Sequence, residues 1–529
     1  MNNVLLIGSG GRESAIIMSI ISSQIKMLYA FENFANKGSV IMSGDAIASC
    51  ITRLKDFCKN RTNIQENSSE FFANLLKNQN QHLLDGYLNP DFIVDNLYCI
   101  PANPQIAKFC NIVNISTSND SIVNFCKKND IKFVIIGPED PLADGLVDEL
   151  EKIGIKAFGP SKLASQIESS KIFMKDFCTE FKIPTAKYAT FYSDKNSKDE
   201  IILFAQDLLN TGSTQIVLKT NGLAAGKGVI ICQNLDEFKT NLDSYFNGKF
   251  GTASQSIVVE EFMQGTEVSF FALCDGTHFK TIGYACDHKK LLDGNQGPNT
   301  GGMGTYSYKE ILTNQQISEV EQNIIKPLVM GMFAKNHPYR GVIFAGLMLT
   351  KQGIRLIEYN ARFGDPETQA ILPLLNNNIM ELLYAATTSV KTLNIDLQNA
   401  ACINVVCVSG GYPDEYKKGI EIQIDSKNVI TSPFVEELNK DKQQIKTSIL
   451  GLLKNEIANL FKNKNKNNQN LAQVIHCGTA INNKCNLVTN GGRVISVCAK
   501  AKTIIQARNI VYNAIKSIKF DGMFYRKDI

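Results

Sequence analysis

The sequence lacks the features that mark membrane proteins and nucleic-acid-binding proteins. Its net charge of +4 over 529 residues is close to neutral, so neither a nucleic acid nor a membrane surface is expected as a partner. The longest apolar runs, such as GVIFAGLML, reach about half of the roughly 20 residues that a membrane-spanning helix needs. No positively charged region precedes Val4, so we expect no signal peptide.

Patterns for metal binding and disulfides are also missing. The 14 cysteines include no C-x-x-C pair, and the 5 histidines have no ligand spacing. Scattered cysteines of this kind are typical of reduced, mostly buried thiols in a cytoplasmic protein without a zinc site. The 44% hydrophobic and 20% charged residues are those of a soluble globular protein. Its length predicts roughly three or four packed units.

The first residues, MNNVLLIGSGGRES, predict a strand, a tight turn, and a helix from Glu13 to about Ser23. The free amides of Gly8, Gly10 and Gly11 at a helix N-terminus suit a phosphate group. A dinucleotide fingerprint would need a further glycine at position 13, which is Glu13. A Rossmann dehydrogenase is therefore disfavoured.

Two later runs, NLYCIPANP and IKFVIIGPED, also read as strands followed by helices. Such βαβ units predict a parallel sheet whose ligand-binding loops lie at the carboxyl ends of the strands. Between the first helix and the second strand, residues 24–95 are rich in Asn, Gln, Ser and Lys. We expect this block to be a surface insertion, with a regulatory or partner-binding module as the alternative.

The segment LKTNGLAAGKGV places Lys219 at the end of a strand, before a loop that contains Gly222, Gly226, Lys227 and Gly228. Glycines let backbone amides close onto a polyphosphate, and lysine adds compact positive charge. The loop is not a Walker motif, because glycine and not Ser or Thr follows Lys227. An ordinary glycine hairpin explains these residues equally well.

The segment IRLIEYNARFGDPE carries a row of polar residues on a predicted strand. Glu358, Asn360 and Arg362 face the same side, because alternate residues of a strand do so. Carboxylate and amide oxygens suit Mg²⁺, and arginine can stabilise a phosphoryl group in transfer. The alternative is an edge strand with a solvated polar face.

A third segment, IVVEEFMQGTEVS, carries Glu260, Glu261 and Glu267, which could contact adenine and ribose hydroxyls. Alone, a solvated acidic turn explains it better. Together with Lys171 on the helix predicted from SSKIFMKDF, these segments fit one ATP and its Mg²⁺ between two α+β lobes.

Several motifs in this order carry a family resemblance: GSGGRE, GPEDPLADGL, SSKIFMKDF, VLKTNGLAAGKGV, GPNTGGMG and RFGDPETQ. The chain resembles the ATP-grasp ligases, and among them the phosphoribosylamine–glycine ligase (glycinamide ribonucleotide synthetase) family. The resemblance implies an α/β and α+β multidomain fold. It places a Rossmann-like parallel-sheet substrate domain at 1–160, the main ATP-grasp lobe at 161–184 and 255–390, the lid at 185–254, and a small β-rich domain at 396–529.

The implied activity is ATP-dependent ligation of glycine to 5-phosphoribosylamine through glycyl phosphate, in purine biosynthesis. ATP and Mg²⁺, or Mn²⁺, would be required by a cytoplasmic monomer, with a dimer as the alternative. The resemblance implies ATP contacts from Lys171, Lys219, Gly222, Gly226, Lys227, Gly228, Glu260, Glu261 and Glu267, and metal ligation by Glu358 and Asn360. It implies catalytic roles for Lys219, Asp287, Lys289, Arg362 and Asp365, and substrate contacts from Gly8, Gly10, Gly11, Arg12, Glu13, Pro138, Glu139, Asn299, Thr300, Gly301 and Gly302.

Two positions depart from the family pattern. Ser14 stands where the family has histidine, and the loop PANPQI replaces PGNAGT, so that Ala102 and Pro104 both depart from the family loop. Both changes lie in the expected phosphoribosylamine pocket. They leave open another ATP-grasp carboxylate–amine ligase or a carboxylase with a different acceptor, and a degenerate nucleotide-binding scaffold. The scaffold is disfavoured because the expected ATP-side charges are all present.

Overall fold

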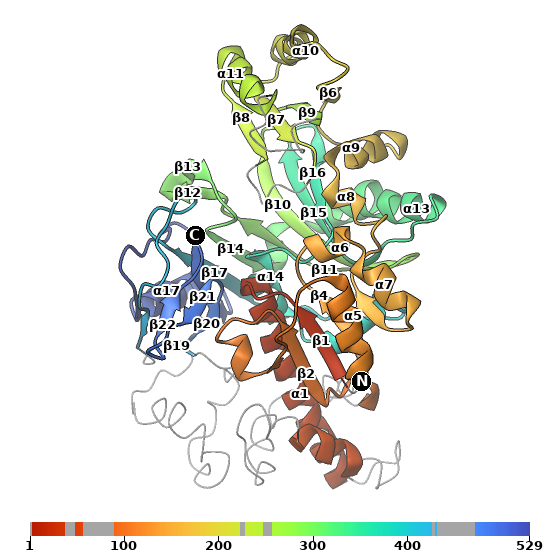
Figure 1. Cartoon of the computed structure of the whole chain (residues 1–529), viewed down its shortest axis with the longest axis vertical. Coiled ribbons are helices and arrows are strands. Elements are labelled where there is room, and N and C mark those ends of the chain that lie inside the picture. The colour runs from red at the N-terminus through yellow and green to blue at the C-terminus, as the bar shows by residue number, and fades with distance from the viewer. Residues whose placement is uncertain are drawn as a thin grey trace.

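The computed structural model describes residues 3–37, 48–56, 89–222, 228–246, 256–425, 429–430 and 471–529. Its largest sheets have nine, five and four strands (Figure 1). Among the helices in these ranges, none is both long and apolar enough to cross a membrane. The described cysteines are free, and all except Cys477 and Cys485 are buried, as the sequence predicts for this part of the chain.

The N-terminal sheet is parallel, with the order β3-β2-β1-β4-β5. Its carboxyl-end loops are the glycine turn after β1, the PANP loop after β2 and the GPED turn after β4, as the sequence predicts. The elements of this unit are β1 (Asn3–Ile7), α1 (Gly11–Lys37), β2 (Asn96–Ile100), β3 (Asn111–Ile112), α5 (Asn119–Lys128), β4 (Ile131–Ile136), α6 (Asp140–Ala143), α7 (Leu146–Lys152) and β5 (Lys156–Phe158).

The first helix is longer than the sequence suggests. The expected end near Ser23 is wrong, because α1 continues to Lys37. Met27, Leu28 and Phe31 extend the apolar face, and all three are buried in the core beneath the sheet. The polar residues before them, Ser22, Ser23, Gln24 and Lys26, hid this helical period. Of the block 24–95, residues 48–56 are also helical, and residues 38–47 and 57–88 lie outside the described chain.

The four-stranded sheet forms a small lobe at one end of the molecule (Figure 1). Its order is β6-β9-β7-β8, and α10 and α11 close its core. Gly226 and Lys227 of the predicted phosphate loop lie outside the described residues. The elements are β6 (Tyr188–Tyr192), α10 (Lys198–Asn210), β7 (Ile216–Thr220), β8 (Val229–Cys232), α11 (Leu235–Phe246) and β9 (Ser256–Glu261).

The nine-stranded sheet, β16-β15-β10-β11-β14-β17-β23-β20-β19, runs from the main lobe into the C-terminal part. The junction is the antiparallel pair β14–β17. The strands are β10 (Thr266–Asp275), β11 (Phe279–Asp287), β14 (Gly304–Tyr308), β15 (Arg340–Thr350), β16 (Gly353–Asn360), β17 (Ala401–Val408), β19 (Val429–Ile430), β20 (Ala472–His476) and β23 (Arg493–Ala501).

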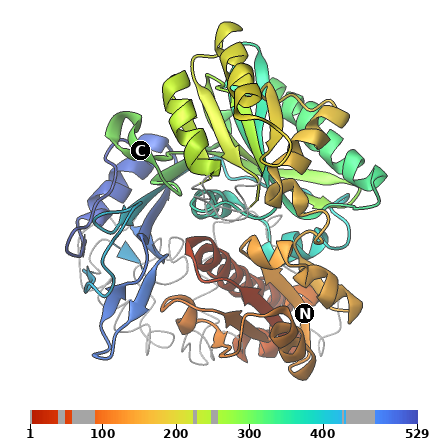
Figure 2. The same cartoon turned by 45° about the horizontal axis from the view of Figure 1, so that its top comes forward.

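The short helix α14 (Glu367–Ile371) lies where the N-terminal unit, the main lobe and the C-terminal part meet. It packs against α1 of the first, β11 and β14 of the second, and β17 and β23 of the third. Figure 2 shows the N-terminal unit, the small lobe and the C-terminal part arranged around this region. The remaining helices are α8 (Gln166–Ser169), α9 (Lys171–Glu180), α12 (Asn314–Val320), α13 (Lys326–Ala334), α15 (Ile379–Ala385) and α17 (Ile504–Ile515). The two-stranded sheets pair β12 (Lys290–Leu292) with β13 (Gln296–Asn299), β18 (Gln423–Ile424) with β24 (Ile518–Lys519), and β21 (Thr479–Ile481) with β22 (Leu487–Thr489).

Candidate active site

A carboxylate on β16 is surrounded by positive charges from separate parts of the chain. Burial alone would raise the pKa of Glu358, but the charges of Lys289, Lys219, Lys171 and Arg362 hold it below its ordinary value. Burial in turn lowers the pKa of Lys171, although Glu358 opposes this. The structure therefore brings together the lysines, the acid and the arginine that the sequence assigned to ATP, metal and phosphoryl transfer. So much positive charge around one acid suits a polyphosphate.

Glu260 joins two buried lysines beneath this cluster. Its carboxylate lies 2.8 Å from Lys219 Nζ and 3.1 Å from Lys175 Nζ. All three side chains are at most 5% exposed. Burial would raise the pKa of Glu260, but the two lysines lower it below its ordinary value. Glu260 therefore fixes the position of Lys219, and its carboxylate is engaged by protein charges in this structure.

The two other predicted nucleotide-binding acids are also paired. Glu261 accepts hydrogen bonds from the Lys187 backbone N–H at 2.8 Å and from Arg355 Nη1 at 2.7 Å. Glu267 forms an ion pair with Lys289, which the sequence had placed in the glycine pocket. Lys171 donates to the Gly222 carbonyl at 3.1 Å, which ties α9 to the start of the predicted phosphate loop.

The donor set at the end of β16 fits Mg²⁺ that is shared with phosphate groups. Glu358 and Asn360 lie two residues apart and supply a carboxylate and an amide oxygen on one side of the strand. Among the described residues, no group of three or more His, Cys, Asp or Glu could hold a metal ion alone. Two protein ligands are sufficient where phosphates and water complete the coordination shell.

The half-buried Asp287 and the buried Glu367 form an acidic pair near Lys289. Burial raises the pKa of Asp287 well above its ordinary range, and the charge of Glu367 adds to the effect. Burial also raises the pKa of Glu367, which accepts a hydrogen bond from Ser269 Oγ at 3.0 Å. Asp287 Oδ1 is buried and has no hydrogen-bond partner within the described protein. This oxygen can accept a hydrogen bond from a bound amine.

Arg362 links the end of β16 to the N-terminal unit. Its guanidinium lies 3.1 Å from Glu139 and 2.9 Å from Glu168. Burial would raise the pKa of Glu139, but Arg362 and Arg12 lower it below its ordinary value. Glu139 follows Pro138 in the turn after β4, so this pair connects the predicted sugar pocket to the phosphoryl-transfer arginine.

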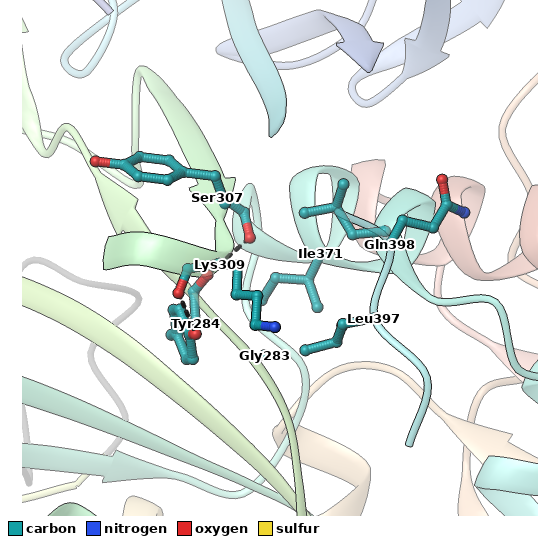
Figure 3. A pocket seen from close by; sticks show the side chains of 9 residues that line it. Gly283, Tyr284, Ser307, Lys309, Ile371, Leu397 and Gln398 are labelled. Carbon is teal, nitrogen blue, oxygen red and sulfur yellow. Dashed lines mark hydrogen bonds between the residues drawn. The ribbon is translucent and has the colours of Figure 1, made fainter. Parts of the chain in front are cut away.

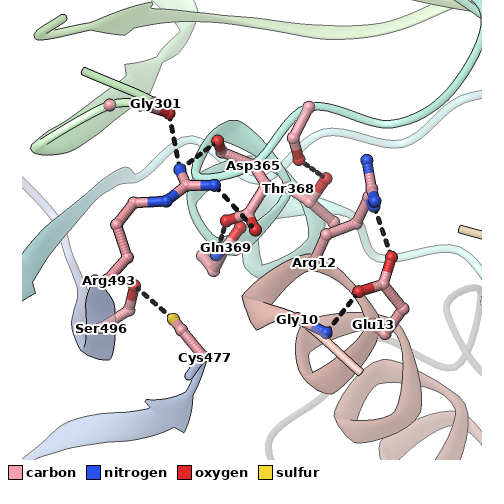
Figure 4. A network of polar contacts seen from close by, with 12 residues as sticks. Gly10, Arg12, Glu13, Gly301, Asp365, Thr368, Gln369, Cys477, Arg493 and Ser496 are labelled. Atoms are coloured by element: carbon pink, nitrogen blue, oxygen red, sulfur yellow. Dashed lines mark hydrogen bonds and ion pairs between the residues drawn. The ribbon is translucent and has the colours of Figure 1, made fainter. Parts of the chain in front are cut away.

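Arg493, from β23, closes the opposite side of the site. Its Nη1 donates to the carbonyls of Gly301 at 2.6 Å and Asp365 at 2.5 Å, and its Nη2 lies 3.3 Å from Asp365 Oδ2 (Figure 4). Gln369 Nε2 donates to Asp365 Oδ1 at 2.7 Å. The glycine-rich loop and the Asp365 turn are thus held together by an arginine of the C-terminal part.

The loop containing residues 299–302 follows the exposed end of β13 and is ordered by Lys289. The N–H and Oγ1 of Thr300 both donate to the Lys289 carbonyl at 2.8 Å. A Cβ on Gly302 would lie 2.8 Å from Asp287 Oδ1 and 2.4 Å from Pro366 Cδ. Only glycine therefore allows this loop to pass so close to the acidic pair.

The glycine turn after β1 packs against the side chains of Glu13 and Gln369. The Gly10 N–H donates to Glu13 Oε2 at 2.6 Å, and Arg12 Nε lies 2.5 Å from Glu13 Oε1 (Figure 4). A Cβ on Gly8 would lie 2.7 Å from the Glu13 side chain, and a Cβ on Gly11 would lie 2.4 Å from Gln369 Nε2. Glu13 thus caps its own helix in the manner of a capping-box glutamate. Close packing against Glu13 and Gln369 therefore requires glycine at these positions, whether or not the turn also binds the predicted sugar phosphate.

A small pocket lies elsewhere, between β11, β14 and the segment after α14 (Figure 3). Tyr284, Ser307, Ile371, Leu397 and Gln398 are among its lining residues. None of the predicted site residues is among the described residues that line it. The charged site and this pocket are therefore lined by different residues.

Sequence reasoning missed four residues of the charged site: Lys175, Glu168, Glu367 and Arg493. Lys175 was seen on its predicted helix but received no role. Arg493 lies in the segment VTNGGRV, where two glycines mark a turn before a strand. Glu367 lies in the motif RFGDPETQ but received no role. Glu168 gives no local signal, because its partner Arg362 is distant in the sequence.

The fold and the charged site together define an ATP-grasp protein. The phosphoribosylglycinamide synthetase models match this chain in three consecutive parts: the N domain at residues 80–168, the ATP-grasp (A) domain at 169–368 and the C domain at 454–529. The chain belongs to the phosphoribosylglycinamide synthetase family.

Curated relatives match over most of the chain. The phosphoribosylamine–glycine ligase of Rhizobium meliloti is 38% identical over 435 residues, which are 82% of this chain and 91% of that protein. The ligase of the same name from Caldanaerobacter subterraneus is 36% identical over 452 residues, covering 85% and 96% of the two chains.

Solved structures agree on the fold. The crystal structure of phosphoribosylamine–glycine ligase from Thermotoga maritima aligns over 100% of both chains, with a TM-score of 0.67 and 22% identity. A biotin carboxylase domain from Hydrogenobacter thermophilus, solved with MgADP and bicarbonate, aligns over 99% of this chain and 91% of its own, with a TM-score of 0.58 and 12% identity. The multidomain fold expected from the resemblance is confirmed.

Proposed function

We propose that this chain ligates glycine to 5-phosphoribosylamine, with conversion of ATP to ADP and phosphate. The observation that carries the proposal is the charge arrangement around Glu358, where Lys171, Lys219, Lys289 and Arg362 converge. The relatives that match most of the chain are named for this activity. A cytoplasmic location and a monomeric state, with a dimer as the alternative, stay predictions.

In this proposal the glycine carboxylate attacks the γ-phosphate of ATP, forming glycyl phosphate and releasing ADP. Lys171, Lys219 and Arg362 would offset the charge that moves during this step, since phosphoryl transfer depends mainly on positioning and electrostatics. Glu358 and Asn360 would hold Mg²⁺, or Mn²⁺, which neutralises phosphate charge when bound.

Glycine would lie among Asp287, Lys289, Asp365 and the loop of residues 299–302. The buried Asp287 oxygen can accept a hydrogen bond from the glycine amino group, and Arg493 holds the opposite wall. The amine of 5-phosphoribosylamine would enter between Glu139 and the glycine turn. Its attack on the acyl carbon forms the amide bond and expels phosphate.

The test is ADP release by the purified protein with ATP, Mg²⁺ and freshly prepared phosphoribosylamine, with and without glycine. We expect release only when both substrates are present. Lys219→Met should lower kcat/KM for ATP by about 100-fold, because it removes a buried charge that faces the phosphates. The control is Lys132→Met, because Lys132 is an exposed lysine that pairs with the nearby Asp130. ADP release that needs glycine but accepts other amines instead of phosphoribosylamine would indicate a ligase with a different acceptor.

A further inference from the structure

One departure from the family pattern, Ser14, contacts the loop that carries the other departures. Ser14 lies in the first turn of α1, and Asn103 lies in the PANP loop after β2. Asn103 Nδ2 lies 2.7 Å from Ser14 Oγ, and Ser14 Oγ donates to the His476 carbonyl at 2.7 Å. Ser14 and Asn103, an asparagine that the family loop PGNAGT also has, therefore share a partner at the end of β20, in the C-terminal part of the chain.

Asn103 also holds the glycine turn itself. Its Nδ2 lies 2.9 Å from the Ser9 carbonyl and 3.1 Å from the His476 carbonyl. Its Oδ1 accepts hydrogen bonds from the backbone N–H groups of Gln105 at 2.9 Å and Ile106 at 3.0 Å. One side chain thus connects the turn after β1, the loop after β2 and the end of β20.

Gln105 completes the connection by imitating a neighbouring strand. Its Nε2 donates to the Val474 carbonyl at 2.8 Å, and its Oε1 accepts from the His476 N–H at 2.9 Å. A side-chain amide that pairs with a C=O and with the N–H two residues later reproduces the hydrogen bonds of a sheet partner. The PANP loop therefore covers part of the edge of β20.

The end of β20 is in turn bonded to the start of β23. The Cys477 N–H donates to the Val494 carbonyl at 3.0 Å, and the Gly478 N–H donates to the Arg493 carbonyl at 2.9 Å. Arg493 is the residue that holds Asp365 and Gly301. A displacement of β20 would therefore move Arg493 relative to the glycine turn.

We propose that Ser14, Asn103 and Gln105 form an interdomain latch that fixes the glycine turn of the proposed phosphoribosylamine pocket relative to Arg493. They are positioning residues and contact no reacting atom. The role in phosphoribosylamine affinity rests on the proposed function, whereas the mechanical link between the two parts of the chain does not. On this view Ser14 and Gln105, which stands where PGNAGT has its second glycine, are one coordinated change, because both bond the backbone of His476. The pocket is then rebuilt and not degraded.

The latch is buried, so its loss has a measurable effect. Ser14, Asn103, Gln105 and His476 are all at most 5% exposed. Removing one member leaves buried polar partners unsatisfied, and such a loss corresponds to about a tenfold change in an equilibrium. We expect the change to appear in the affinity for phosphoribosylamine.

The first experiment compares Gln105→Ala with Gln24→Ala. Gln24 makes the same kind of contact, with Nε2 bonded to the Phe92 carbonyl and Oε1 to the Val94 N–H, both at 2.9 Å, but within the N-terminal unit. We expect Gln105→Ala to raise KM for phosphoribosylamine about tenfold with KM for ATP within about twofold. Gln24→Ala should lower Tm and leave both KM values near wild type. Equal effects of the two variants on KM for phosphoribosylamine would overturn the latch.

The second comparison uses serines on the same helix. Ser14→Ala should raise KM for phosphoribosylamine, whereas Ser23→Ala should not, because the buried Ser23 Oγ accepts from Ile379 of the main lobe. Ser14→His should be worse than Ser14→Ala, since the hydroxyl site is enclosed by Asn103 and His476. Full activity of Ser14→His at an unchanged Tm would contradict a coordinated change.

A measurement without substrates separates failure of the latch from failure of the proposed function. Amide hydrogen exchange should become faster in residues 471–480 and also in 493–497 when Gln105 is replaced by Ala, and not when Gln24 is replaced. Faster exchange confined to the PANP loop would refute the latch even in an active enzyme. If the wild type releases no ADP when both substrates are present, the proposed function fails. The pattern of amide hydrogen exchange then decides by itself whether the mechanical link exists.

Discussion

Arg493 Nη2 and Asp365 Oδ2 lie 3.3 Å apart although 128 residues separate them in the chain. The same guanidinium also bonds the Asp365 and Gly301 carbonyls. An arginine can satisfy several acceptors at once because its donors form a rigid fork. The glycine-binding wall of the proposed site is therefore built by residues from the ATP-grasp and C-terminal parts together.

Arg493→Lys should lower kcat/KM for glycine by about 100-fold, because a single ammonium cannot reproduce the fork. Steady-state kinetics with glycine as the varied substrate provide the measurement. Arg340→Lys is the control, since Arg340 pairs with Glu151 at the surface, where both side chains are more than 40% exposed. Equal activity of Arg493→Lys and wild type would remove Arg493 from the site.

Glu260→Gln should destabilise the protein by about 3–5 kcal/mol, because it leaves Lys175 and Lys219 buried without a counter-charge. The folded pKa of Glu260 lies below its ordinary 4.5, so the ionised acid stabilises the fold above that pH. That stability is lost as the pH falls through the lower, folded pKa.

The unfolding free energies of wild type and Glu260→Gln should therefore differ fully at neutral pH and converge below pH 4.5. Glu149→Gln, which breaks an exposed pair with Lys152, should change stability by less than about 1 kcal/mol. A constant difference from pH 7 to below the folded pKa would mean that the charge of Glu260 is unimportant.

His476 should make stability depend on pH in mildly acidic solution. Burial, and to a smaller extent Lys108, lowers the pKa of His476 from 6.5 to about 4. Between these values the unfolded chain binds a proton that the folded chain does not, so stability falls as the pH decreases from 6.5 towards 4. The loss amounts to about 3 kcal/mol.

His476→Asn should flatten this part of the pH–stability curve, since asparagine can keep the contact with Thr479 without taking up a proton. Urea unfolding at a series of pH values makes the comparison. Parallel curves for the two proteins would show that His476 is protonated equally in both states.

Gly11→Ala should destabilise the protein by about 1–3 kcal/mol through overpacking. Its Cβ would lie 2.4 Å from Gln369 Nε2 and 2.7 Å from Cys477 Sγ. We expect KM for phosphoribosylamine to rise as well. Gly154→Ala is the comparison, because Gly154 has a φ of +77° but, among the described residues, no neighbour within 4 Å of an added Cβ. A smaller loss of stability for Gly11→Ala than for Gly154→Ala would exclude the packing argument.

Much of the fold was predictable because the strands are short apolar runs that end in glycine or polar turns. The β1, β2 and β4 strands and their carboxyl-end loops were found in this way. The extent of α1 was not, because the polar residues Ser22, Ser23, Gln24 and Lys26 before Met27 concealed its buried face. Alternation along β16 correctly grouped Glu358 with Asn360.

The pairing of charges could not be predicted from local pattern. Glu168 and Arg362 are far apart in sequence and meet only when α8 packs beside β16. Glu13 seemed only to break a glycine fingerprint, yet it caps α1 and fills the space between Gly8 and Gly10. Local sequence indicates which residues are chemically suited to a site, but long-range packing decides which partner each residue receives.

The continuous nine-stranded sheet limits how the chain can be divided. Because β14 and β17 are paired over five residues each, expressing residues after 396 as a separate polypeptide would strip both strands of a partner. Each fragment would present an open apolar edge that invites aggregation. The C-terminal part is thus built as an extension of the catalytic core, and a split version of this enzyme should recover activity only when both fragments are folded together.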